Sequence, residues 1–390
     1  MILAPRLPLA LRQLTDAPVK TIAASAGICF STVLVFFQLG LLNAIYQSQA
    51  RPYSLLDGEI VLVSNRFTRL SQSPEIALSD VMRAQGVEGV ARVSPLSIQL
   101  GTVLVLPQGF TTNAQIYSID LSNPALAIDK ARLNISALTL YERASIDIFS
   151  RPSYVKNATK KLSTNSDYRT DLGTKRLLVN STSSIGSTFA ADLSLVMSQD
   201  NLIHYFPARN YSLVNFGIVK LLPGYSTQKV LNTLTSSLYP TGYSIKAMSV
   251  PEISDEEMKY WRVNTSLSFI FGIGVIVGFV VSGIILYQIL YSDVISHLPE
   301  YATLLALGYP NIYVIKVVFV QAFLLTALSF PFSLAISLGL YTLMASATNL
   351  VIYMTFARSI SVFLLSLLTS AFSCYLATNQ LRKVDPSTLY

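Results

Sequence analysis

The sequence predicts a membrane protein with four transmembrane helices and one α+β domain outside the bilayer. The first observation is four long apolar runs, each with the roughly 20 residues of helix that cross a hydrocarbon core. The second is a large polar stretch between the first two runs, which holds most of the 28 basic and 21 acidic residues of the 390-residue chain. The runs are Thr21–Tyr46, Ser266–Tyr291, Tyr313–Met344 and Ser359–Ala377.

These runs divide the chain into nine expected segments. They are a cytoplasmic N-terminal segment (1–20), a first transmembrane helix with its stalk (21–50), the outer α+β domain (51–253), a second stalk and transmembrane helix (254–291), a cytoplasmic loop (292–312), a third transmembrane helix (313–344), a short outer loop (345–358), a fourth transmembrane helix (359–377) and a cytoplasmic tail (378–390). Basic residues such as Lys20 and Lys383 flank the outermost runs, so the positive-inside rule predicts that both termini are cytoplasmic.

The outer domain has short strand and helix signals separated by turns. We expect strands at 59–64, 117–121 and, on either side of Pro95 and Gly101, within 90–106, a helix at 73–85, and a β-α-β unit made of 216–222, 226–238 and 243–250. Residues 119–200 are expected to form an inserted lobe. Residues 151–176 are polar and rich in Ser, Thr, Asn and Lys, which predicts an exposed excursion.

A stalk is expected before the second transmembrane helix. Ser254 followed by Glu257 has the spacing of a capping box, which predicts that a helix starts here. A continuous helix from Asp255 to Tyr291 would be about 55 Å long at 1.5 Å per residue, nearly twice the bilayer core. Trp261 would then lie near the membrane interface.

The sequence contains none of the residue patterns of the catalytic sites that we sought. It has two histidines, His204 and His297, which the topology places on opposite sides of the membrane, and it lacks the Gly-X4-Gly-Lys-Ser/Thr motif of a nucleotide-binding loop. We therefore expect no enzyme activity, metal site or cofactor in this chain. The diffuse positive charge does not indicate a nucleic-acid partner, and we expect membrane lipids as its surroundings.

Small residues recur at four-residue spacing in the second transmembrane run. Gly274, Gly278 and Ser282 lie on one face of the expected helix, where small side chains let helices approach closely in lipid. The sequence leaves open whether this face packs within one subunit or forms a dimer contact.

The cytoplasmic loop is expected to contain a short helix. Pro299 suits its first turn, Glu300 favours the N-terminal end of the helix dipole, and Gly308 suits the position just after the helix. An apolar face follows from Leu298, Tyr301, Leu304 and Leu305. Such a helix lies on the membrane or docks into a groove on a partner protein, and residue chemistry alone does not separate the two.

Residues 297–309, directly after Tyr287–Tyr291, resemble the corresponding loop of DevC-type permeases in the MacB/FtsX-like superfamily of ABC transporter permeases. The resemblance extends over essentially the whole chain. It includes Leu7–Leu14, Gln38–Gly40, Ser187–Asp192 and Leu381–Pro386.

This resemblance implies the permease subunit of a tripartite efflux system in the inner membrane, with a periplasmic domain. It implies a homodimer that works with two copies of a separate ABC ATPase subunit, a periplasmic membrane-fusion protein and a TolC-like outer-membrane channel. Residues His297–Gly308 would be the ATPase-coupling helix, with Glu300 facing the ATPase. Mechanotransmission along the stalk helices would then drive export, with an envelope glycolipid as the expected cargo because DevC systems of cyanobacteria export such lipids.

An alternative in the same superfamily is an FtsX-like regulator, whose outer domain activates a periplasmic cell-wall hydrolase and transports nothing. An independent carrier or receptor would need no ATPase partner. The sequence separates these functions poorly, because the first two share four spans and a coupling helix.

Overall fold

The structure is a computed structural model that describes residues 9–105, 108–164, 166–186, 188 and 190–381. The ends of the expected cytoplasmic segments, and parts of the resemblance at Leu7–Leu14, Ser187–Asp192 and Leu381–Pro386, lie outside the described residues. The chain forms two compact units. We call them the helical unit (Met1–Leu42, Ser266–Leu343 and Ile352–Tyr390) and the α+β unit (Asn43–Thr265 and Met344–Val351).

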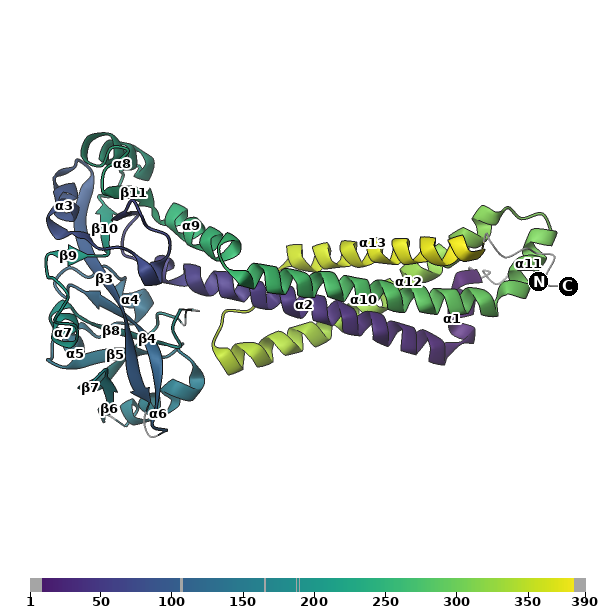
Figure 1. The fold of residues 1–390 in the computed structure, drawn as a ribbon, viewed down its shortest axis with the longest axis horizontal. Helices are drawn as coiled ribbons and strands as arrows, with labels where there is room; N and C mark the ends of the chain where they lie inside the picture. The colour runs from purple at the N-terminus through teal and green to yellow at the C-terminus, as the bar shows by residue number, and fades with distance from the viewer. Residues whose placement is uncertain (1–8, 106–107, 165, 187, 189, 382–390) are drawn as a thin grey trace. The chain divides into compact units, whose positions relative to one another are not determined.

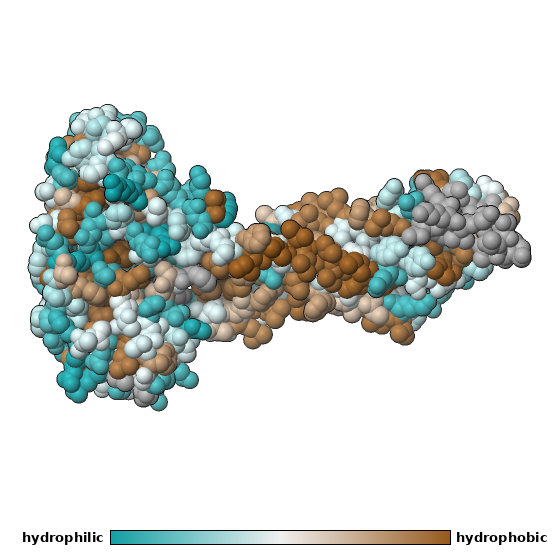
Figure 2. Space-filling view, in the orientation of Figure 1, coloured by the Kyte–Doolittle hydropathy of each residue, from teal (hydrophilic) through white to brown (hydrophobic). Residues whose placement is uncertain are grey.

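Four of the helices are long and apolar enough to cross a membrane. They are α2 (Pro18–Ser54), α10 (Ser266–Ser296), α12 (Asn311–Thr348) and α13 (Phe356–Leu381), and they run side by side (Figure 1). Hydrophobic residues cover most of the outside of this bundle (Figure 2). Two short helices, α1 (Leu9–Asp16) and α11 (Leu298–Ala306), complete the helical unit. The predicted fold class, four apolar helices with an α+β domain, is confirmed.

Hydroxyl groups connect the long helices inside the helical unit. Tyr341 of α12 donates to the backbone carbonyl of Phe36 in α2 at 2.5 Å, and Ser373 of α13 donates to that of Gly283 in α10 at 2.8 Å. Thr326 of α12 and Ser370 of α13 lie 2.5 Å apart. Polar side chains of this kind hold helices together where the surrounding lipid supplies no hydrogen-bond partners.

The α+β unit contains a nine-stranded sheet, in the order β11-β1-β10-β3-β4-β8-β5-β7-β6. Its strands are β1 (Ile60–Ser64), β3 (Val90–Val105), β4 (Phe110–Ile119), β5 (Arg143–Asp147), β6 (Tyr168–Leu172), β7 (Lys175–Ser183), β8 (Leu193–Ser198), β10 (Phe216–Leu221) and β11 (Ile245–Ser249). Two short strands, β2 (Ile76–Ala77) and β9 (Leu213–Val214), pair separately. Parallel pairs occur at β4–β8 and β5–β7.

The helices of this unit are mostly short. They are α3 (Leu78–Met82), α4 (Ile128–Ala131), α5 (Ile135–Leu138), α6 (Pro152–Leu162), α7 (Gln199–Tyr205), α8 (Thr227–Thr233) and α9 (Val250–Val263), with single turns η1 (Leu70–Gln72), η2 (Arg83–Gly86) and η3 (Leu234–Leu238).

Strand β6 also returns to pair with the end of β3, so β3, β4, β8, β5, β7 and β6 close into a ring. The ring surrounds its own apolar cluster, which includes Ile116, Ile146, Leu177 and Leu195. Residues 119–200 supply four of these strands, and β3 and β4, which precede Leu121, supply the other two. The inserted segment is therefore completed by strands from the rest of the unit.

One expectation about local structure is wrong, and another holds only in part. Residues 90–106 hold one long strand instead of two, because β3 passes from β10 to β4 next to Pro95, where the lack of an N–H costs little. Residues 151–176 are mostly exposed, as expected, but they form α6, β6 and the start of β7. Val155 and Ala158 of α6 and Tyr168 of β6 are buried in the ring cluster.

The expected start and length of the second stalk are also wrong. Helix α9 begins five residues earlier than predicted, with Ser249 as its N-cap and Glu252 completing the capping box. Ser254 lies inside the helix. The helix ends at Val263, and Asn264 and Thr265 separate it from α10, so α9 and α10 are two helices instead of one continuous rod.

Candidate functional site

Helix α11 forms at the position predicted for the cytoplasmic loop. Pro299 lies in its first turn, and Gly308 follows its last turn with a φ of +90°, a conformation that glycine adopts without strain. The N–H of Tyr309 donates to the carbonyl of Leu304 at 3.1 Å, a hydrogen bond typical of a glycine-terminated helix. The sequence around Gly308 therefore fixes where the helix stops.

One face of α11 packs on the N-terminal helix α1. Tyr301 is only 2% exposed and lies in an apolar cluster with Ala10 and Val317, against which Leu304 also packs. The Tyr301 hydroxyl donates to the side-chain oxygen of Gln13 at 3.3 Å, and the Gln13 amide donates to Glu300 at 3.4 Å. Gln13 was not identified from the sequence, since nothing in the loop pattern points to α1.

Acidic side chains surround His297 on two sides. Its Nε2 lies 3.6 Å from Asp293 in α10 and its Nδ1 lies 3.4 Å from Glu300 in α11. Asp293 also accepts a hydrogen bond from Gln321 of α12. His297 and its neighbours thereby join α10, α11 and α12 at this end of the helical unit.

The opposite face of α11 is open. Glu300, Thr303 and Leu307 are exposed, and Leu307 has 72% of its surface free. The expected apolar face is the one that packs inward: Tyr301 and Leu304 lie in the cluster with Ala10 and Val317, and Leu298 is half-buried. The side chain of Leu305 lies outside the described part of the chain. The outward surface contains Leu307, which the sequence analysis missed.

The small-residue face of α10 packs on α2. A methyl group on Gly274 would lie 2.7 Å from the side chain of Gln38, and one on Gly278 would lie 2.8 Å from Val35. Gly278 and Ser282 are buried within the helical unit. A contact within one chain therefore occupies this face, and a dimer contact through it stays a prediction.

At the stalk of the α+β unit, Glu257 of α9 is 1% exposed and joins three parts of the chain. Its Oε2 accepts hydrogen bonds from the Tyr53 hydroxyl at 3.0 Å and from the Leu70 N–H at 2.7 Å. Its Oε1 accepts one from the Trp261 indole at 2.8 Å. We call Tyr53, Leu70, Glu257 and Trp261 the stalk junction.

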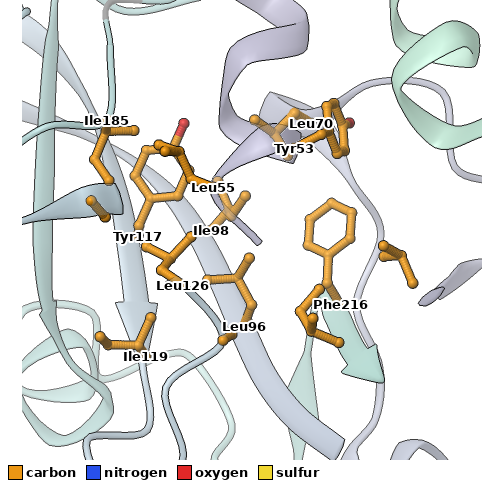
Figure 3. Packing of buried hydrophobic residues seen from close by; sticks show 14 of the residues in the cluster. Tyr53, Leu55, Leu70, Leu96, Ile98, Tyr117, Ile119, Leu126, Ile185 and Phe216 are labelled. Atoms are coloured by element: carbon orange, nitrogen blue, oxygen red, sulfur yellow. The ribbon is translucent and has the colours of Figure 1, made fainter. Parts of the chain in front are cut away.

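The stalk junction lies against the largest apolar cluster of the α+β unit. Tyr53 lies beside Leu70 in this cluster (Figure 3), so the end of α2 is anchored in the domain core. Burial raises the pKa of Glu257, although the hydrogen bonds from Trp261, Leu70 and Tyr53 favour its charged form. Trp261 is 7% exposed and bound to Glu257, so its side chain is held within the α+β unit, and its expected place near the membrane interface stays a prediction.

Among the described residues, no group of His, Cys, Asp and Glu side chains could hold a metal ion. His204 lies on the α+β unit, where its Nδ1 is 2.6 Å from the Tyr141 hydroxyl and its Nε2 is 3.5 Å from Glu142.

A comparison with protein families finds a match, mostly in the helical unit. Residues 270–386 match the family described as FtsX-like permease C-terminal, a range that begins in α10 and includes α11 and α12. This part of the chain, about a third of its length, is similar to that family. No curated protein matches the chain in sequence.

Two solved structures resemble about half of the chain. The periplasmic region of MacB from Actinobacillus actinomycetemcomitans is 13% identical, covers 52% of this chain and 92% of its own, and has a TM-score of 0.35. The extracellular domain of the noncanonic ABC-type transporter YknZ from Gram-positive bacteria is 12% identical, covers 49% of this chain and 98% of its own, and also has a TM-score of 0.35.

Proposed function

We propose that this chain is the permease subunit of an ABC-type exporter and that a separate ATPase subunit docks on α11. The observation that carries the proposal is the exposed face of Glu300, Thr303 and Leu307 on a short helix within the part of the chain that matches the FtsX-like permease family. The sequence has no nucleotide-binding loop of its own, which fits a partner that hydrolyses ATP. An exposed leucine about two helical turns from an exposed carboxylate is suited to an apolar pocket with a basic group farther along its rim.

Movement of α11 would reach the α+β unit along continuous helices. α1 and α12 hold α11 through Gln13, Tyr301 and Val317, and α2 continues unbroken from Pro18 into the stalk junction. There Glu257 joins the end of α2 to α9. This chain of contacts supports transmission of motion between the two ends of α2.

The finer parts of the proposal come from the resemblance to DevC-type permeases. They are a homodimer with two ATPase copies, a membrane-fusion protein and a TolC-like channel as partners, an inner-membrane location with cytoplasmic termini, and an envelope glycolipid or similar amphiphile as cargo. Analysis of envelope lipids in a deletion strain tests the cargo. If the deletion strain keeps all its envelope lipids but shows altered cell-wall hydrolase activity, the FtsX-like regulator is favoured instead.

The docking face can be tested with charge substitutions. Leu307→Asp should weaken the ATPase complex by roughly tenfold, since burying a leucine contributes about 1.5–3 kcal/mol. Glu300→Ala should reduce ATP hydrolysis by the complex. Leu304→Asp is a poor probe, because Leu304 packs against the apolar cluster of Ala10, Tyr301 and Val317 and its substitution would also disturb folding.

Tyr353→Asp is a matched control, because Tyr353 is 46% exposed in the helical unit but lies in the loop between α12 and α13. The measurement is recovery of a P-loop ATPase with the tagged protein from native membranes. Equal recovery with Leu307→Asp and the control would contradict docking at α11. Recovery of the wild-type protein without any ATPase would contradict the proposed function itself.

A further inference from the structure

A buried carboxylate organises the turn that follows β5. Asp147 is 0% exposed, and its two oxygens accept hydrogen bonds from the N–H groups of Ile185 at 2.7 Å and Gly186 at 3.1 Å. The hydroxyl of Ser150 donates to Asp147 at 3.2 Å and accepts from the N–H of Ser194 at 2.9 Å. The turn Asp147–Ser150 is therefore fastened to the segment between β7 and β8 and to the start of β8.

The end of α2 contacts this turn. The Arg51 guanidinium lies 4.5 Å from the centre of the Phe149 ring, close enough for a cation–π interaction. The side chain of Arg51 also runs along Gly186, where a methyl group would approach its Cδ to 2.5 Å. Gly186 has a φ of +107°, so both its conformation and the space that Arg51 fills call for glycine.

The segment after α12 contacts the same turn. The side-chain amide of Asn349 donates to the carbonyl of Ser150 at 2.9 Å and reaches that of Ile148 at 3.4 Å. Asn349 has a φ of +57°, a left-handed conformation that asparagine tolerates better than most residues, and its N–H donates to Ala345 to close the end of α12. One residue thus ends α12 and binds the turn.

We propose that Asn349 is a positioning residue that fastens the end of α12 to the turn Asp147–Ser150, so that α12 acts on the α+β unit beside α2. The inference rests on the proposed function for its mechanical meaning. Movement of α12 would reach β5 and β8 through the carbonyls of Ile148 and Ser150. Movement of α2 would reach the same turn through Arg51.

Two substitutions separate the amide from the backbone conformation. Asn349→Gly keeps the left-handed conformation and removes the side-chain donor. Asn349→Asp has nearly the same shape, but it places carboxylate oxygens opposite two carbonyl oxygens and so repels the turn. Asn180→Ala is the matched control, because the Asn180 amide donates to the carbonyl of Ala137 at 2.9 Å in the same unit without contacting the turn.

The first measurement is hydrogen–deuterium exchange of the full-length protein in detergent. Both Asn349 variants should raise exchange of the peptide that covers 147–151 by about fivefold, the ratio expected for one lost hydrogen bond. Asn180→Ala should leave this peptide unchanged. Unchanged exchange in both Asn349 variants would overturn the attachment.

The second measurement repeats the exchange on the complex with its co-purified ATPase, with and without ATP and vanadate. The wild type and Asn180→Ala should show a nucleotide-dependent change in the 147–151 peptide, and both Asn349 variants should lose most of it while ATPase binding persists. An undiminished change would overturn the positioning role. If the wild type carries no ATPase, the proposed function fails, whereas the first measurement still decides the attachment.

Discussion

Tyr53 donates its hydroxyl to Glu257 at 3.0 Å, although 204 positions separate the two residues in the chain. Tyr53 ends the helix that contains the first apolar run, and Glu257 lies in the helix that precedes the second. Two chain segments that lead to the membrane are thus tied to each other inside the α+β unit. Both side chains are almost fully buried, so water does not compete for this hydrogen bond.

Tyr53→Phe should lower the free energy of unfolding of the α+β unit by about 2 kcal/mol, because the lost hydrogen bond goes to a carboxylate. Under the proposed function, Tyr53→Phe should also reduce export more than its effect on stability explains. Tyr239→Phe removes another buried tyrosine hydroxyl, bonded to the carbonyl of Asp80 at 2.8 Å, and serves as the control. The test compares thermal melting with export, and equal export by the two variants would contradict a coupling role for Tyr53.

The raised pKa of Glu257 predicts a pH dependence of stability. In the folded protein, the Glu257 carboxyl keeps its proton at a pH where the unfolded chain has already lost it. The resulting stabilisation is therefore complete below the ordinary carboxyl pKa of 4.5 and is lost as pH rises through the raised pKa of the folded state. Glu257→Gln cannot ionise and should therefore flatten the fall in melting temperature as pH rises above the ordinary carboxyl pKa of 4.5.

The fluorescence of Trp261, the single tryptophan of the chain, follows this unfolding directly because its indole is bound to Glu257. Gln at position 257 weakens the stalk junction at every pH. The test therefore compares the slope of melting temperature against pH, not the melting temperature itself. Parallel pH curves for the wild type and Glu257→Gln would show that Glu257 ionises normally in the fold.

Asp147→Ala should be among the most damaging substitutions in the α+β unit. It leaves the N–H groups of Ile185 and Gly186 buried without their acceptor, which costs about 3 kcal/mol or more. Asp120→Ala, which removes a more exposed carboxylate bonded to Ser122, should cost less than about 1 kcal/mol. Chemical denaturation followed by circular dichroism compares the two, and equal losses would mean that Asp147 does not organise its turn.

Gly278→Leu should destabilise the helical unit by about 1–3 kcal/mol, because its side chain would overlap Val35 of α2. Gly272→Leu places the same side chain on the same helix, where nothing lies within 4 Å of the added methyl group, and should be tolerated. The measurement is the melting temperature in detergent. Similar melting temperatures for the two variants would contradict close packing of α2 and α10.

Sequence alone was enough for the four spans and the short helix α11. The hydropathy of a whole run predicts a span, and the local residues Pro299 and Gly308 predict where α11 starts and stops. Both predictions can therefore be made without knowledge of the fold. The stalk was harder. Ser254 and Glu257 have capping-box spacing, but so do Ser249 and Glu252, and the buried Glu257 is needed to bind Tyr53 and Leu70.

The remaining misses depend on contacts that are distant in the chain. Residues 151–176 look polar because only a few apolar positions, such as Val155 and Tyr168, face the ring cluster. Gln13 and Asn349 each matter through two side-chain hydrogen bonds to residues more than a hundred positions away. No periodicity in either local segment reports such a partner.

The position of β1 between β10 and β11 sets the order in which this protein can be built. β1 is among the first strands synthesised, yet both of its neighbours come from residues 216–249, just before α9. The nascent domain must therefore wait, with an apolar strand unpaired, until almost all of it has left the ribosome. A chaperone that shields residues 60–64 until residues 216–249 have been synthesised would protect this strand while it has no partner.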